Sequence, residues 1–407
     1  MDSLRDSIAM KRLSSIDIIW SAHQDATSIF QELKNQQPRI QNELFNLRQE
    51  IPASRSCATF KSGQYLRPYG HFRAFYRQIS QKSVLGFKGC DIFAEDIPQK
   101  LTELRKFRSQ SANSMLQSLI QVEEKVPMAM TLPETLQEAQ KAAEFQTTYL
   151  KRYGELARMP VPLLVCRWRS PQIAKFKMNL ITVLTPHEKD RVHRIANKGL
   201  GALVYFYPAL PIRVRHLAQL AHRCERENSI DRFHRQKKMA SVFGNWPTPR
   251  ETISRWITLT ARILALGYSP YRISHPHNGH CIQEQNAVID GGFADVDSLQ
   301  PLDKIKDDIM FYNACMMTKE YLSLTINRFL NGYEKYDSDS PPILLSKSQL
   351  AVARRLRREI TQQLRIEERN GYTIDARLFH AFDGKQWRLD HDSSLRNSHL
   401  IAPKKRI

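Results

Sequence analysis

The sequence of 407 residues has no run of about eighteen apolar residues, the length that a membrane-spanning helix needs. Its N-terminus mixes charged residues into the apolar positions, so it does not indicate a secretion signal. Cysteine is scarce: the six residues are scattered, without a CxxC pair or a histidine at zinc-finger spacing. We therefore expect no membrane span, no structural zinc site, and a reduced, cytoplasmic compartment.

Acidic residues are outnumbered, because 61 Lys and Arg face 41 Asp and Glu and leave a formal charge of +20. This excess predicts a polyanionic partner, such as nucleotide phosphates, nucleic acid, an acidic protein or an anionic surface. Much of it lies in 212–238, in 353–365 and in the tail PKKRI. Solvated faces of amphipathic helices are the simplest account of the first two segments.

The pattern of apolar residues divides the chain into zones. Residues 1–52 have apolar residues at helical intervals, whereas 57–90 alternate apolar and polar residues around glycines and indicate strands and turns. Residues 133–157 have the periodicity of a helix, with a proline at its start. The apolar runs 159–168 and 201–212 are typical of buried strands. The chain from about 214 onward is mainly helical.

One segment, 271–297, interrupts this helical part. It follows the helix RETISRWITLTARILALG, which Gly267 terminates, and reads HPHN, GHCI, a QEQ turn, NAVI and then Asp290 with two glycines. We predict a strand hairpin, GHCI with NAVI, that presents Asn278 and Asp290. Their oxygens suit Mg²⁺, and the glycines allow close approach of the backbone to phosphates. The segment therefore predicts the metal and phosphate end of a nucleotide site.

At these positions the chain resembles the protein-kinase-like superfamily, in which a catalytic-loop Asn and the Asp of a DFG-type motif hold the metal ions. Asn278 and Asp290 correspond to them, with Asp-Gly-Gly-Phe where the family has Asp-Phe-Gly. The resemblance implies an α+β, two-lobed fold with a strand-rich small lobe over 53–212 and a helical large lobe over 213–407, after a helical extension over 1–52. It also implies ATP and Mg²⁺ as cofactors.

The same resemblance implies a strand-borne lysine that contacts phosphate and a glutamate on the next helix that pairs with it. Lys88 in SVLGFKG fits the lysine, although a lysine at a strand end is commonly a surface residue. Glu144 fits the glutamate, with Glu138 and Glu155 as alternatives because sequence alone does not fix the helix register.

Two further small-lobe features fit the resemblance. SGQYLRPYGHF, with Gly63 and Gly70, corresponds to the turn that covers the phosphates. ALVYFYPALP corresponds to the last small-lobe strand and the hinge.

The group that activates the acceptor departs from the family pattern. Kinases and aminoglycoside-type phosphotransferases place a catalytic Asp five residues before the metal-binding Asn, where this chain has Ile273. The selenoprotein O group, which transfers AMP, has a carboxylate immediately before the Asn, where this chain has His277. FKGCD and IDGGFADVD are similar to segments of that group. A neutral imidazole makes His277 the candidate base, with His275 or His280 assisting.

Two later features have alternative interpretations. Asp295 and Asp297 are either additional metal ligands or an N-cap of the next helix, and the cap is favoured. Residues 303–336 have the periodicity of a helix pair and end in FLNGYE, which resembles a helix of small-molecule phosphotransferases in the superfamily. Core packing is the preferred account of that ending.

The sequence therefore predicts an ATP- and Mg-dependent transferase that moves a phosphoryl or adenylyl group to an unknown protein or small-molecule acceptor. Lys88 would orient the phosphates, Asn278 and Asp290 would hold Mg²⁺, and His277 would act as base. An ATP-dependent ligase is a variant, because adenylation of a carboxylate needs no hydroxyl-activating Asp. The alternative is a basic nucleic-acid-binding or scaffold protein with a degenerate nucleotide cleft, bound to its partner through charge.

Overall fold

The computed structural model describes residues 16–21, 27–53, 65–66, 74–78, 84–89, 129–170, 173–174, 177, 184–207, 249–272, 280–281, 287–288, 290–294, 296, 299–330 and 347–383. The chain divides into two compact units, one of residues 1–156 and 160–208 and the other of residues 157–159 and 209–407. The first unit includes the segment that the sequence assigns to a separate N-terminal extension.

The first unit is built on an antiparallel sheet in the order β1-β6-β7-β4-β3-β2, with β5 also paired to β7. Its strands are β1 (Ile16–Ser21), β2 (Tyr65–Leu66), β3 (Ala74–Gln78), β4 (Val84–Lys88), β5 (Met130–Thr131), β6 (Val161–Trp168) and β7 (Leu200–Tyr207). Strands β4 and β7 are buried along their whole length, and every residue of β7 is apolar, whereas β4 ends in Lys88. The strands predicted in 57–90, 159–168 and 201–212 are thereby confirmed.

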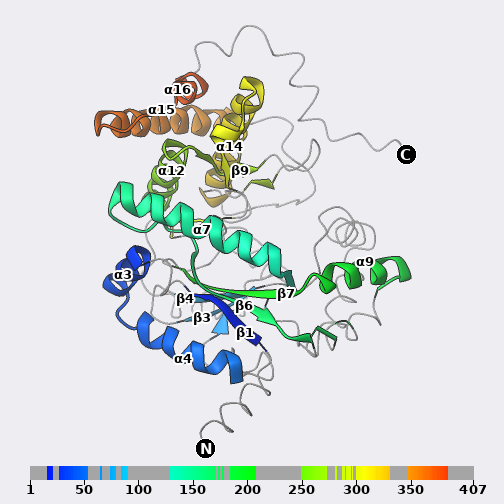
Figure 1. The fold of residues 1–407 in the computed structure, drawn as a ribbon. Helices are drawn as coiled ribbons and strands as arrows, with labels where there is room; N and C mark the ends of the chain where they lie inside the picture. The colour runs from blue at the N-terminus through cyan, green and yellow to red at the C-terminus, as the bar shows by residue number, and fades with distance from the viewer. Residues whose placement is uncertain are drawn as a thin grey trace, which may run out of the picture. The chain divides into compact units, whose positions relative to one another are not determined.

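Four described helices belong to this unit: α3 (Thr27–Gln36), α4 (Ile40–Ala53), α7 (Leu132–Tyr153) and α9 (Pro186–Asn197). Helix α7 confirms the helix predicted over 133–157 and packs on β6 and β7 (Figure 1). Side chains of α3, α4 and α9 share one hydrophobic core with Leu85 and Phe87 of β4. Because successive side chains of a strand point to opposite faces, Lys88 points away from the face that Phe87 covers.

The prediction of an all-helical segment over 1–52 is wrong at 16–21. This segment, IDIIWS, forms the edge strand β1 and pairs with β6, where Ile18 lies opposite Cys166. Asp17 on β1 accepts hydrogen bonds from Arg169 at 3.0 and 2.6 Å, and these bonds lower the pKa of Asp17. The β-branched isoleucines gain more from the sheet edge than from a short helix, because pairing also covers the edge of β6.

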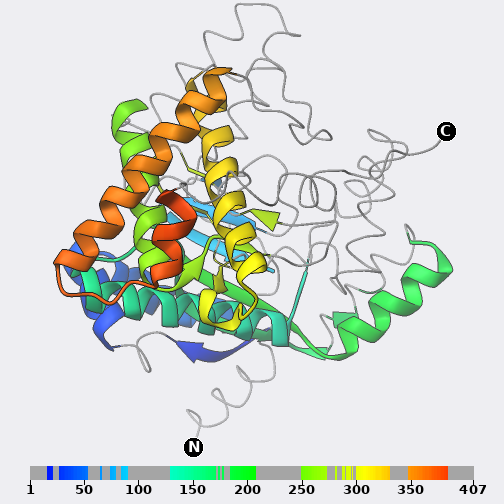
Figure 2. The ribbon, with the colours of Figure 1, turned by 90° about the horizontal axis from the view of Figure 1, so that it is seen from above.

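The second unit is mainly helical. Its helices are α12 (Pro249–Ala265), η3 (Leu302–Lys304), α14 (Asp308–Leu330), α15 (Lys347–Arg369) and α16 (Ala376–Asp383), and its short strands are β8 (Tyr268–Ser269), β9 (Tyr271–Arg272), β10 (His280–Cys281) and β11 (Gln300–Pro301). Helix α15 contacts α12, α14 and α16, and Figure 2 shows it in orange beside green α12 and yellow α14. The helix pair predicted over 303–336 is one continuous helix, α14, in the described residues.

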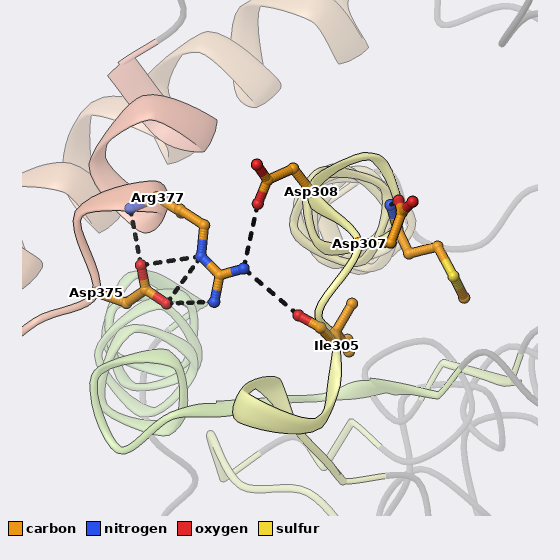
Figure 3. Close-up of polar contacts among 6 residues, drawn as sticks. Ile305, Asp307, Asp308, Asp375 and Arg377 are labelled. Carbon is orange, nitrogen blue, oxygen red and sulfur yellow. Dashed lines mark hydrogen bonds and ion pairs between the residues drawn. The ribbon is translucent and has the colours of Figure 1, made fainter.

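The start of α16 is fastened to the start of α14 by one arginine (Figure 3). The guanidinium group of Arg377 donates to Asp375 at 2.8 Å, to Asp308 at 3.3 Å and to the carbonyl oxygen of Ile305 at 3.4 Å. It also lies over the ring of Phe311, 4.1 Å from the centroid. These contacts of Arg377 hold the start of α16 against the start of α14 and stabilise the second unit.

The described sheet is antiparallel throughout and is accompanied by helices, so the fold is α+β, as the sequence predicts. Among the described helices, none is long and apolar enough to cross a membrane.

Candidate functional site

Lys88 ends a strand that is paired on both sides. Strand β4 is hydrogen-bonded to β3 and β7, and Lys88 lies opposite Ala74 and Leu203. The lysine is largely buried, because the whole residue is only 9% exposed. A buried ammonium group is costly unless it is paired, so this position requires a partner.

Helix α7 supplies that partner. Thr131 caps its start with a reciprocal bond to Glu134, and Gly154 closes its end with a left-handed φ of 69°. Between these caps, one face of the helix is buried on the sheet and carries Thr135, Glu138, Ala139, Ala142 and Phe145. Glu138 is therefore a buried carboxylate held on a well-defined helix.

Lys88 and Glu138 form a buried ion pair. The lysine Nζ donates to Glu138 Oε1 at 2.5 Å, and the two side chains are 11% and 8% exposed. Glu144, which the sequence favoured as the partner, is exposed and lies six residues along the helix, about 240° around its axis from Glu138. The structure therefore corrects the partner to Glu138, the alternative whose spacing from Thr135 and Ala142 places it on the buried face.

Two glycines allow this close packing. A Cβ on Gly201 of β7 would lie 2.4 Å from Thr135 Oγ1, so a side chain there would push α7 away from the sheet. A Cβ on Gly86 of β4 would lie 2.2 Å from the ring of Tyr205. Gly201 thus lets α7 approach β7 three residues before Glu138, and Gly86 makes room for the Tyr205 ring on β7.

Asp290 lies in a tight turn of the second unit. Ala287 bridges to Phe293, and the N–H of Val288 donates to the carbonyl oxygen of Gly292 at 2.9 Å. The indole N–H of Trp256 on α12 donates to the carbonyl oxygens of Val288 and Gly292, at 3.0 and 3.3 Å. The backbone of the turn is thereby fixed against the buried side of α12.

The segment 157–159 closes over the same turn. The N–H of Phe293 donates to the carbonyl oxygen of Arg158 at 3.0 Å. A Cβ on Gly292 would lie 2.3 Å from that oxygen, and one on Gly291 would lie 2.4 Å from Arg255 Cβ. Both glycines after Asp290 are therefore required by packing, and this account needs no phosphate.

Two arginines hold the carboxylate of Asp290. Its Oδ2 accepts from Arg158 at 2.9 Å, and its Oδ1 accepts from Arg255 at 3.1 Å. The Asp290 side chain is 14% exposed, whereas those of Arg158 and Arg255 are 39% and 38% exposed. Each carboxylate oxygen is thus used by a guanidinium group.

This arrangement does not fit a Mg²⁺ ligand. A dication beside Asp290 would meet two positive charges, and its preferred oxygen ligands would have to be taken from the arginines. Over the described ranges, no group of three or more His, Cys, Asp or Glu side chains is placed to hold a metal ion. The prediction that Asp290 is a metal ligand is therefore not supported by its surroundings.

Several predicted site residues lie outside the described residues: His277, Asn278, Gly63, Gly70, His275, Asp295 and Asp297. Ile273, which stands where kinases have a catalytic Asp, also lies outside them. The predicted hairpin of GHCI with NAVI differs from the pairing that is described. His280 and Cys281 pair with β9, and Ala287 bridges forward to Phe293.

The described cysteines are unsuited to nucleophilic chemistry. Cys166 and Cys315 are both buried, and burial raises the pKa of each thiol above its usual range. The reactive thiolate is accordingly suppressed at both positions.

Sequence reasoning missed Arg158 and Arg255. Arg158 is 132 residues from Asp290 in the chain, and no local pattern marks it as a partner. Arg255 lies on α12 among other polar residues of an amphipathic helix, so its spacing is equally uninformative. Lys88 and Asp290, which the sequence analysis predicts as site residues, both form ion pairs in the structure.

No protein-family model matches the chain, and a search of curated proteins finds no significant match.

Proposed function

We propose that the protein binds ATP and transfers its phosphoryl or adenylyl group to a protein or small-molecule acceptor. The observation that carries the proposal is the buried pair of Lys88 and Glu138. The lysine strand β4 precedes the glutamate helix α7, and strands β6 and β7 follow, as in the resemblance to a kinase-like small lobe, although the short strand β5 precedes α7 and helix α9 separates β6 from β7. A kinase-like fold is accordingly part of the proposal.

The chemistry of the pair suits a polyphosphate. A lysine with three donors can keep one on Glu138 and direct others at phosphate oxygens. Glu138 orients the ammonium group and offsets the cost of burying it, so little reorganisation is needed when phosphate arrives. In this proposal Lys88 contacts ATP and Glu138 positions Lys88.

The remaining roles rest on the sequence. His277 is proposed as the base that activates the acceptor. Asn278 is proposed to lie at the phosphate-binding end of the nucleotide site. Mg²⁺ is assigned no step, because the surroundings of Asp290 do not fit it. Transfer of AMP to a carboxylate, the ligase variant, uses the same lysine and glutamate and differs only in the acceptor.

Calorimetric titration of the full chain with ATP tests the proposal. We expect binding that Lys88→Met abolishes and that Lys151→Met, an exposed lysine on the same helix as Glu138, leaves unchanged. Mass analysis of the products then separates the reactions, because ADP reports phosphoryl transfer, pyrophosphate with AMP attached to the acceptor reports adenylyl transfer, and free AMP with pyrophosphate reports the ligase variant. Absence of ATP binding in the unaltered protein overturns the proposal.

A second candidate is a scaffold that binds nucleotide without turning it over. The ion pairs of Asp290 with Arg158 and Arg255 favour it. Both carboxylate oxygens accept from an arginine, so neither is left to bind the metal ion that kinase-like transfer uses. ATP binding that depends on Lys88, without any product over extended incubation with candidate acceptors, is the result that selects the scaffold.

A further inference from the structure

Helix α15 has an exposed stripe of arginines. Each residue of an α-helix turns the chain by about 100° around the helix axis. Six residues of α15 therefore lie within a sector of about 100°: Arg354, Arg355, Arg358, Gln362, Arg365 and Arg369. All six side chains are exposed. The stripe, as defined by these six residues, contains five positive charges and no acidic residue.

The opposite side of α15 is used for packing. Leu356, Ile360 and Leu364 are at most 1% exposed and lie on the side that faces the other helices. Because α15 contacts α12, α14 and α16, its apolar face is committed within the unit. The helix therefore cannot insert that face into a lipid interface, as an amphipathic membrane helix does.

Acidic residues lie only at the margins of the stripe. Glu359 accepts from Arg355 at 2.6 Å, so this edge is partly neutralised. Glu368 is exposed on the other margin, and Glu367 is buried. Between these margins, Arg354, Arg358, Arg365 and Arg369 form a positive row with the neutral Gln362 near its middle, about 22 Å long at the rise of an α-helix.

We propose that this stripe binds the phosphodiester backbone of a nucleic acid, without reading its sequence. Guanidinium groups match phosphate oxygens in bidentate geometry, and a row of about 22 Å spans roughly six phosphates of one strand at duplex spacing. The stripe has no aromatic or apolar anchor, which a tight protein interface normally has at its centre. This surface is independent of Lys88 and of ATP.

The test uses the full chain and a fluorescein-labelled oligonucleotide of about 20 nucleotides, single-stranded or as a duplex, measured by anisotropy between about 50 and 200 mM salt. The unaltered protein is expected to bind both forms, with an affinity that falls steeply with salt. In Arg354→Gln/Arg358→Gln/Arg365→Gln/Arg369→Gln, we expect at least tenfold weaker duplex binding and a log–log salt slope smaller by about 3 to 4. Gln matches Arg in helix propensity, so α15 should persist.

A control variant removes the same charge elsewhere. Arg39→Gln/Lys151→Gln/Arg194→Gln/Arg250→Gln changes four exposed residues outside α15. It should keep most of the affinity and the slope, and a stripe of four lysines in place of the arginines should restore most of the binding. Equal losses in the stripe and control variants overturn the proposal, as does no binding by the unaltered protein. Stripe-dependent binding to phosphatidylserine vesicles but not to the oligonucleotides overturns it in favour of a membrane surface.

Discussion

Lys88 on β4 donates to Glu138 on α7 across 50 residues of sequence, with 2.5 Å between Nζ and Oε1. The sheet fixes one partner and the capped helix fixes the other. An ion pair with this little exposure contributes modestly to stability, because desolvation offsets much of the attraction. Stability alone therefore gives little reason to bury an ammonium group here, and the proposed function assigns it a task.

Removing one partner of this pair should destabilise the first unit. Lys88→Met leaves Glu138 buried without its cation, and such a loss costs roughly 3–5 kcal/mol. The double variant Lys88→Met/Glu138→Leu should recover most of that stability in urea unfolding, yet still fail to bind ATP. A double variant that binds ATP as well as the unaltered protein would show that the pair is only structural.

The fold is more accessible from sequence than the site. Apolar runs identify β6 and β7, and the periodicity with a proline at the start identifies α7, because these signals are local. The edge strand β1 was missed, since six residues have little periodicity of their own and the sheet decides their state.

The polar contacts show the same limit. Lys88 and Asp290 stand out in the sequence, but their partners do not, since the contacts join distant segments. The partner of Lys88 could have been chosen correctly by requiring the glutamate to lie on the buried face of α7. Arg158 has no such local criterion.

The arginine contacts of Asp290 predict its response to Mg²⁺. Asp290→Ala frees two partly exposed guanidinium groups and should lower the free energy of unfolding by roughly 1–3 kcal/mol. Thermal unfolding of the unaltered protein should not shift when Mg²⁺ replaces EDTA, because a ligand stabilises only the state that binds it. A rise in Tm with Mg²⁺ that Asp290→Ala abolishes would instead identify Asp290 as a metal ligand.

We expect Gly292, in the turn after Asp290, not to tolerate a larger residue. In Gly292→Ala, the new Cβ would lie 2.3 Å from the carbonyl oxygen of Arg158, and overpacking of this kind costs about 1–3 kcal/mol. Gly267→Ala is a suitable comparison, because its Cβ meets nothing within 4 Å and only its φ of 80° is strained. Hydrogen exchange of the Phe293 amide, which donates to Arg158, should accelerate in Gly292→Ala alone. Equal acceleration in both variants would contradict this account.

The carboxylate of Asp375 predicts a pH dependence at the start of α16. The hydrogen bonds from Arg377 hold the pKa of Asp375 below its usual value of about 3.9. A depressed pKa in the folded state contributes stability above the unfolded value, and this contribution is lost as the pH falls through the folded pKa. Asp375→Asn should therefore cost stability near neutral pH, and the difference should shrink below about pH 4.

The expected size is small, since exposed ion pairs contribute roughly 0.2–1 kcal/mol. Asn keeps a side-chain oxygen that can accept from the N–H of Arg377, as Asp375 does at 2.9 Å, so the cap of α16 is preserved and the loss reports charge. Urea unfolding from pH 3 to 7 measures it in both the native and the Arg377→Gln backgrounds. Without the guanidinium group, Asp375→Asn should have little effect at any pH. If Asp375→Asn lowers the free energy of unfolding equally in both backgrounds, the guanidinium group is not the cause of the low pKa of Asp375. The hydrogen bond from the backbone N–H at the start of α16 would then be its cause.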